Sequence, residues 1–136
     1  MKGNSSAVLA AILRNTIEAS PEVVRALIAS QQSEKSFQKQ VIEVAHAFRW
    51  AVAAFRTARS SDGAWLTPVQ AEGKGFPDLV LVRTGGGGGV LFRELKTNKG
   101  RLSAEQEHWQ EWLTLAGADV GVWRPRDFQR ILEELR

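Results

Sequence analysis

Two apolar runs joined by five consecutive glycines are the feature that most limits the fold of this chain. "DLVLVR" (residues 78–83) and "VLFRELK" (residues 90–96) have the apolar character of core strands, and the glycine-rich segment between them has the length of a turn. The pattern therefore predicts a β-hairpin with its turn near Gly86. With that centre, the numbers of paired residues add up to about 172, so Asp78 is expected opposite Glu94.

The charged residues of this hairpin predict a metal site. Alternation along the second strand places Glu94 and Lys96 on one face, and Asp78 joins them from the first strand. Two facing carboxylates, roughly 5 Å apart at Cβ, repel each other unless a proton or a cation lies between them. Carboxylate oxygens suit Mg²⁺ or Mn²⁺, and an ammonium group can hold an attacking water, which together indicate hydrolysis of a phosphate ester. The alternative to a metal site is that Asp78 is a turn residue after Pro77 and that Glu94 and Lys96 form an ion pair on a solvated face.

The rest of the chain predicts one α/β domain with a mixed sheet flanked by helices. Two short helices are expected in an N-terminal helical extension, residues 1–32, where Pro21 follows the potential N-cap Ser20. The main domain, residues 33–136, is expected to contain a helix up to about residue 48 and a strand over 50–56. A long loop precedes the hairpin, and a helix capped by Ser103, the strand "DVGVW" and a terminal helix follow it.

The composition indicates the cellular compartment and the kinds of partner to expect. Cysteine is absent, which excludes disulfides and thiolate metal sites and favours the cytoplasm. The early apolar run "AVLAAIL" is too short to span a bilayer, so no membrane association is expected. The formal net charge of +3 permits a polyanionic partner without requiring one.

Four segments together carry a resemblance to a known family. "FPD" before a strand and "ELK" at the end of the next strand look like the PD-(D/E)XK nuclease superfamily, and the flanking helices narrow the match. "SEKSFQKQVIEVAHAFRW" and "TNKGRLSAEQEHWQEWLTLAGADVGVWRP" resemble the VRR-NUC branch, especially its stand-alone viral and bacterial members. The resemblance implies a restriction-endonuclease-like core in which Asp78 and Glu94 bind metal and Lys96 assists the water. It also implies that the backbone carbonyl of Leu95 is a ligand.

The resemblance further implies a glutamate on the first core helix, and Glu34 is the candidate. It shares a helical stripe with Phe37 and Val41, although an acid in a first helical turn is also favoured by the helix dipole. Gln38, one turn later, is the other candidate. Gln106 matches the capping box "SAEQ" and also lines up with the inward stripe of its helix, and the family often has a glutamine near the site here.

Nucleic acid is the expected partner. The resemblance implies a structure-selective DNA endonuclease acting on branched, Holliday-junction-like DNA, and a homodimer. The runner-up is a non-catalytic nucleic-acid-binding or assembly module that retains the fold. Trp109, Trp112 and Trp123 fit core faces. The loop residues expected to contact DNA are Arg56, Arg59, Trp65, Lys74, Lys99 and Arg101.

Overall fold

The computed structural model describes residues 33–55, 58–59, 65–66 and 69–136. The helices predicted in residues 1–32 lie outside this part. The described helices are α3 (Glu34–Ala47), α4 (Ala104–Leu115) and α5 (Phe128–Leu135), the last preceded by the 3₁₀ turn η1 (Pro125–Asp127). The strands are β1 (Ala51–Ala54), β2 (Ala58–Arg59), β3 (Trp65–Leu66), β4 (Leu79–Arg83), β5 (Gly89–Leu95) and β6 (Asp119–Trp123). None of the described helices combines the length and apolar character needed to cross a membrane.

Four strands form a mixed sheet in the order β1-β4-β5-β6, which confirms the predicted α/β class. β1 and β5 are both antiparallel to β4, whereas β6 is parallel to β5. In the hairpin, Val80 pairs with Phe92 and Val82 pairs with Val90, so the register predicted from the glycine turn is confirmed. The long loop expected before the hairpin was only partly right, because β2 and β3 pair within it as a small antiparallel ribbon. The Asp62–Gly63 dipeptide between them is a hairpin signal that the prediction overlooked.

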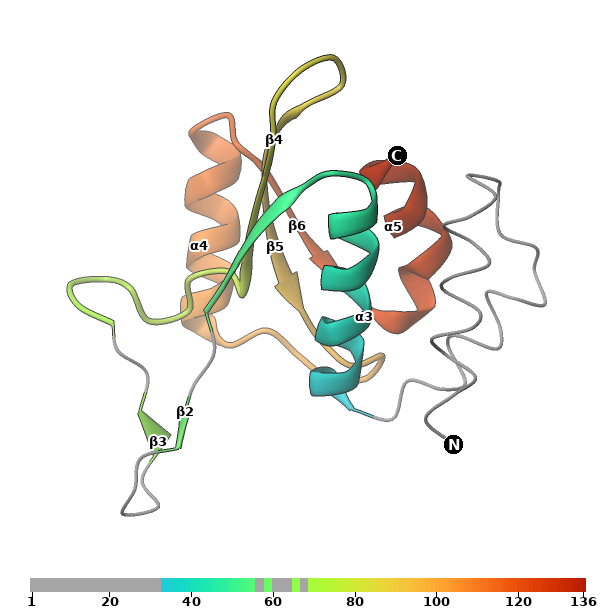
Figure 1. Cartoon of the computed structure of the whole chain (residues 1–136). Coiled ribbons are helices and arrows are strands. Elements are labelled where there is room, and N and C mark those ends of the chain that lie inside the picture. Colours follow the sequence, from blue (N-terminus) through green and yellow to red (C-terminus); the bar gives the residue numbers. More distant parts are fainter. Residues whose placement is uncertain (1–32, 56–57, 60–64, 67–68) are drawn as a thin grey trace.

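Helices cover the two faces of the sheet unequally. α3 and α5 lie side by side on one face, and α4 lies on the other (Figure 1). The face under α3 and α5 holds the main core. Its fully buried side chains include Phe37, Val41, Leu79, Leu81, Leu95, Trp123 and Leu132.

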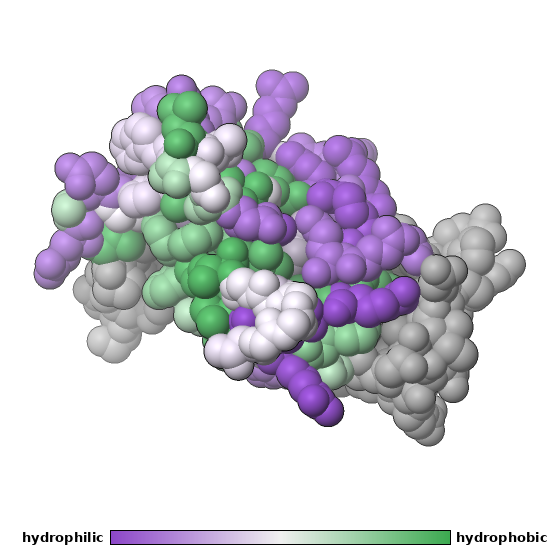
Figure 2. All heavy atoms as spheres, turned by 90° about the horizontal axis from the view of Figure 1, so that it is seen from above, coloured by the Kyte–Doolittle hydropathy of each residue, from purple (hydrophilic) through white to green (hydrophobic). Residues whose placement is uncertain are grey.

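The face beneath α4 is more open. No residue of α4 is buried, and Trp112 is 47% exposed, so the expected core position of Trp112 was wrong, whereas Trp123 is buried as expected. Only one side of α4 packs on the sheet, so the side of the helix that carries Trp112 remains in solvent. Val82 and Val90, which pair near the glycine turn, are also exposed on this face. Figure 2, viewed from above the molecule of Figure 1, shows apolar surface on one side of this end and hydrophilic surface on the other.

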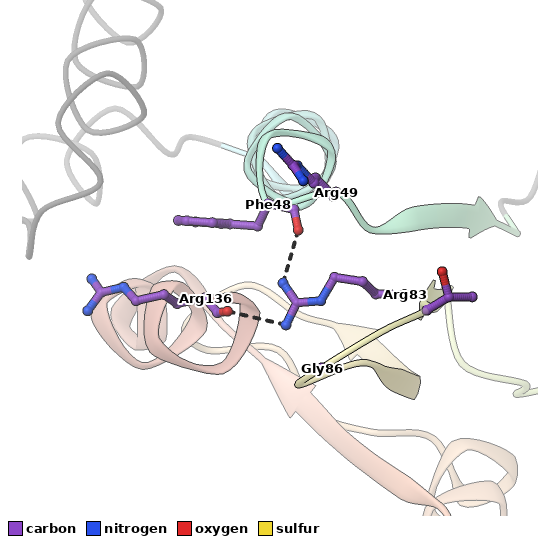
Figure 3. A pocket seen from close by; sticks show the side chains of 6 residues that line it. Phe48, Arg49, Arg83, Gly86 and Arg136 are labelled. Carbon is purple, nitrogen blue, oxygen red and sulfur yellow. Dashed lines mark hydrogen bonds between the residues drawn. The ribbon is translucent and has the colours of Figure 1, made fainter.

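Arg83 ties the turn end of the hairpin to two helix ends. Its guanidinium lies 4.4 Å from the centroid of the Trp50 ring. A cation is favoured at the C-terminal ends of helices, where carbonyl oxygens lack helical partners. The side chain lines a surface cavity of about 500 Å³, at the end of β4 opposite to Asp78 (Figure 3). Arg83 donates hydrogen bonds of 2.8 to 3.2 Å to the carbonyl oxygens of Phe48, Leu135, Gly87 and Arg136.

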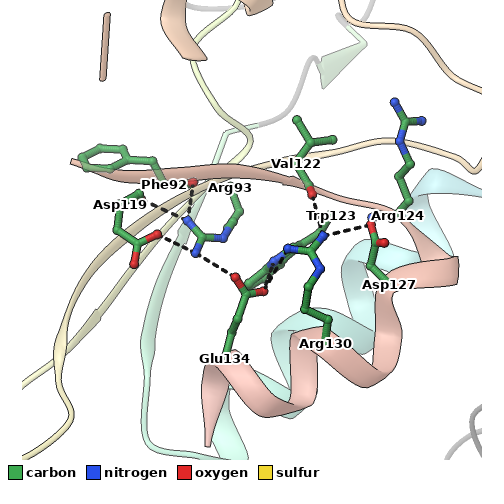
Figure 4. Close-up of polar contacts among 9 residues, drawn as sticks. All are labelled: Phe92, Arg93, Asp119, Val122, Trp123, Arg124, Asp127, Arg130 and Glu134. Carbon is green, nitrogen blue, oxygen red and sulfur yellow. Dashed lines mark hydrogen bonds and ion pairs between the residues drawn. The ribbon is translucent and has the colours of Figure 1, made fainter. Parts of the chain in front are cut away.

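Arg93 fixes the opposite side of β5 from Glu94. Its side chain is only 4% exposed and pairs with Asp119 at 2.7 Å and with Glu134 at 3.3 Å (Figure 4). Its guanidinium also lies 5.1 Å from the centroid of the Trp123 ring, and Trp123 donates an indole hydrogen bond of 2.7 Å to Glu134. This network joins β5, β6 and α5, so the strand that carries Glu94 is held against its neighbours.

Candidate active site

Asp78 and Glu94 meet at the end of the β4–β5 ladder. The ladder ends with the pair Leu79 and Arg93. The same register continued by one residue sets Asp78 opposite Glu94. The side chain of Asp78 is held by the backbone, because its Oδ2 accepts a hydrogen bond of 2.9 Å from the amide of Leu95. Pro77, immediately before Asp78, is buried and has a restricted φ, which limits the freedom of this segment. The structure thus brings the two predicted carboxylates together.

Glu94 is a buried carboxylate with one oxygen unsatisfied. The residue is 1% exposed, and although its Oε1 accepts a hydrogen bond, its Oε2 has no partner. Burial raises the pKa of Glu94 to about 9, with the Asp78 carboxylate as the next cause. The Lys96 ammonium opposes this rise in pKa, which places Lys96 within electrostatic reach of the pair. An orphaned, buried carboxylate oxygen next to a second carboxylate requires either a proton or a bound cation.

Gln106 joins the capping box of α4 to this carboxylate. Its Oε1 accepts a hydrogen bond of 2.8 Å from the amide of Ser103, and its Nε2 donates one of 2.9 Å to Glu94 Oε1. The Ser103 hydroxyl accepts in return from the amide of Gln106 at 3.2 Å. The capping contact with Ser103 and the contact with the site that were expected for Gln106 are therefore both present. Because the cap uses the amide oxygen, the amide nitrogen is directed to Glu94 and leaves Glu94 Oε2 as the open position.

The segment before Asp78 is docked on α4 through a glycine that sequence reasoning missed. Gly75 has φ +84°, and a Cβ added to it would lie 2.6 Å from the carbonyl carbon of Glu105 and 2.7 Å from the amide nitrogen of Gln106. The Trp109 indole also donates a hydrogen bond of 2.9 Å to the carbonyl of Glu72. Only glycine fits this close approach, and nothing in the local sequence marks it, because the backbone that it meets belongs to a distant helix.

Glu34 is the better placed of the two helix candidates. It is half-buried at the first position of α3, and its charge contributes to the raised pKa of Glu94. Gln38 instead lines an open groove of about 460 Å³ on α3, together with Lys35, Lys39 and Glu43. Within the described ranges, no three acidic or histidine side chains converge closely enough to hold a metal ion by themselves. A metal at this site would consequently need backbone oxygen or water in addition to the carboxylates.

The predicted DNA-contacting residues are only partly placed. Lys99 and Arg101 are exposed on the loop that follows β5. Arg124 anchors this loop by donating hydrogen bonds of 2.6 Å to the carbonyls of Thr97 and Gly100. Lys74 is exposed and pairs with Glu105 at 3.4 Å, a surface ion pair of small energy. Arg56 lies outside the described residues, as do the side chains of Arg59 in β2 and Trp65 in β3.

Comparison with known protein families identifies the domain. The model of the VRR-NUC domain matches residues 19–127, which is most of the chain and begins within the predicted N-terminal extension. No curated protein and no solved structure matches the chain. The matched range contains the Asp78–Glu94 pair, Lys96 and the capping box of α4. The chain therefore belongs to the VRR-NUC domain family and carries a nuclease-type domain.

Proposed function

We propose that this protein is a metal-dependent DNA endonuclease that hydrolyses phosphodiester bonds. The observation that carries the proposal is the buried Glu94, whose Oε2 lacks a hydrogen-bond partner beside a second carboxylate. A protein that only bound nucleic acid would gain nothing from burying an acid next to Asp78, because both groups repel phosphate. Membership of a nuclease family supports the same assignment.

The donor set fits a hard divalent cation. Asp78 and Glu94 would supply carboxylate oxygens to Mg²⁺, or to Mn²⁺ in its place, and the carbonyl of Leu95 and the carboxylate of Glu34 are the further candidates. When bound, such a cation stabilises negative charge that develops on the phosphate oxygens. Its charge would also remove the need for a proton on Glu94, whose Oε2 has no hydrogen-bond partner.

Residues of the protein itself have separate roles in this hydrolysis. Lys96 would hold the attacking water by a hydrogen bond, and the effect of its ammonium charge on the pKa of Glu94 supports this role. Gln106 keeps Glu94 in one orientation, and the Leu95 amide does the same for Asp78. The water oxygen forms a bond to phosphorus as the ester P–O bond breaks. One product strand therefore ends in a phosphate and the other in a hydroxyl group.

Lys99 and Arg101 are exposed on the anchored loop beside this site and are suited to contact DNA phosphates. Phosphate contacts give affinity and orientation with little readout of base sequence. We assign the same role to Arg56, Arg59 and Lys74, and a base-contacting role to Trp65. By likeness to the family, we propose that branched DNA is the preferred substrate and that the protein acts as a homodimer.

The test is cleavage of supercoiled plasmid and of a synthetic four-way junction in Mg²⁺, Mn²⁺ or EDTA. Wild type is compared with Asp78→Ala and Lys96→Ala, and Glu133→Gln serves as an exposed-acid control on α5. Cutting should require metal and should be lost in the first two variants only. Metal-independent cutting or full activity of Asp78→Ala would refute the mechanism, and DNA binding without cutting would favour the non-catalytic alternative. Equal cutting of linear duplex would refute the preference for branches.

A further inference from the structure

Phe55 lies in the same cross-strand row as the two carboxylates. β1 pairs with β4 so that Ala54 faces Leu79, and one further step in this register sets Phe55 opposite Asp78. The Phe55 amide donates a hydrogen bond of 2.8 Å to the Asp78 carbonyl, which fixes this pairing. Since Asp78 is in turn opposite Glu94, the sheet presents Phe55, Asp78 and Glu94 side by side on three neighbouring strands. Adjacent strands are about 4.8 Å apart, so Phe55 is the immediate cross-strand neighbour of Asp78, and Glu94 lies one strand further.

The ring is held on one side and open on the other. Its centroid lies 5.6 Å from that of Phe76, with the two rings at 87°, and Phe76 packs in the same edge-to-face manner on Trp109 and Phe92. Phe55 nevertheless remains 52% exposed. In the part of the chain whose side chains are described, Phe55 and Trp112 are the exposed large aromatic residues, and Phe55 is the one next to the acid pair.

The exposure of the Phe55 ring costs folding free energy, and its packing on Phe76 does not account for this exposure. Burying a phenyl ring contributes about 1.5–3 kcal/mol, and Phe55 forgoes a large part of that while occupying a fixed position. A flat, preoriented apolar surface beside a phosphate-directed site matches one kind of ligand group, the face of a nucleobase. Aromatic side chains bind bases in this way with little dependence on sequence.

Resting on the proposed nuclease function, we propose that Phe55 stacks on a base of the nucleotide next to the phosphate that is cut. The acid pair acts on the phosphate, and the ring, one strand further, receives the base attached to the neighbouring sugar. Inside a continuous duplex both faces of each base are already covered by other bases. A base at a branch, a nick or a single-stranded flank has an uncovered face, so Phe55 gives the site a physical reason to favour interrupted duplexes.

The test uses Phe55→Leu, which keeps apolar bulk but removes the aromatic face, and Phe55→Trp, which restores such a face. Leu115→Ala, which changes the apolar side chain that is 77% exposed on α4, is the control. A four-way junction carries 2-aminopurine on either side of the mapped cut, and binding is measured with Ca²⁺ in place of Mg²⁺. Wild type, Phe55→Trp and Leu115→Ala should quench the fluorophore by stacking. Phe55→Leu should lose the quenching and raise the Kd on the order of tenfold.

The outcomes separate this inference from the proposed function. If wild type cuts DNA but Phe55→Leu quenches and binds as wild type does, the stacking role is overturned and the nuclease stands. If Phe55→Leu and Phe55→Trp lose binding together and both unfold at lower temperature, the ring serves only the fold, which also overturns the inference. If wild type cuts no DNA with any metal, the proposed function itself fails, and that result is visible without any Phe55 variant.

Discussion

Replacing Glu94 with glutamine should stabilise the metal-free protein while abolishing nuclease activity. Glutamine keeps the shape of the side chain, and its amide oxygen can accept the hydrogen bond that Gln106 now donates. Its amide nitrogen can donate to the Asp78 carboxylate, the charged neighbour that contributes to the raised pKa of Glu94. The variant therefore removes the ionisation and retains the packing.

The size of the effect follows from the raised pKa of Glu94. The carboxyl titrates near its ordinary value of 4.5 in the unfolded chain and at about 9 in the fold, so the folded state binds the extra proton over that range. Stability from this group is fully present below pH 4.5 and is lost as the pH rises towards 9. At pH 7 the metal-free wild type should be less stable than at pH 4.5 by about 3 kcal/mol from Glu94 alone. For a chain of this length, this corresponds to a Tm difference on the order of 10 °C.

Thermal unfolding in EDTA from pH 5 to pH 9 measures this difference. The Tm of Glu94→Gln should rise relative to wild type as the pH increases, because the variant lacks the titrating group. Added Mg²⁺ should raise the wild-type Tm at pH 8 and leave that of the variant unchanged, since a ligand that binds only the folded state stabilises it. Parallel curves of Tm against pH for the two proteins in EDTA would refute the reasoning.

Three further predictions concern the residues that support the site. Gly75→Ala introduces a Cβ clash and an unfavourable φ, so it should lower the free energy of unfolding by about 2–3 kcal/mol, whereas Gly86→Ala, in open space, should not; urea titration compares them. Gln106→Ala and Ser103→Ala should each cost about 1 kcal/mol by loss of the cap, but only Gln106→Ala should also reduce the cleavage rate. Arg93→Leu should destabilise by about 1–3 kcal/mol in calorimetry, because the carbonyls of Phe92 and Asp119 lose a buried donor and Asp119 and Glu134 lose a shared cation; an unchanged stability would contradict this.

The hairpin was predictable because every signal in it agreed. Apolar alternation, the glycine turn and the positions of Asp78 and Glu94 all supported one register, and the structure has that register. The helix boundaries near Ser103 and Gly117 were equally accessible, since a capping box and a glycine with positive φ mark them. Local sequence was therefore sufficient to predict the structure wherever a short segment determines its own conformation.

The remaining features depend on contacts between distant segments. Gly75 carries no sign in its own neighbourhood that it will meet the backbone of α4, and the position of Phe55 beside Asp78 depends on how β1 pairs with β4. Trp112 was assigned to a core face because helical periodicity shows which side of α4 is apolar, but not how much of that side the sheet can cover. The burial of Glu94 likewise required the packed structure.

The turn that sets the hairpin register also offers a point of attachment. Gly86 has no atom within 4 Å of an added Cβ, and it lies at the end of β4 opposite to Asp78. The chain contains no cysteine, so Gly86→Cys would introduce a single thiol. A fluorophore or a surface linker coupled there would leave the acid pair and Phe55 accessible. The same glycines that align the two strands thus allow the protein to be labelled or immobilised in one defined orientation.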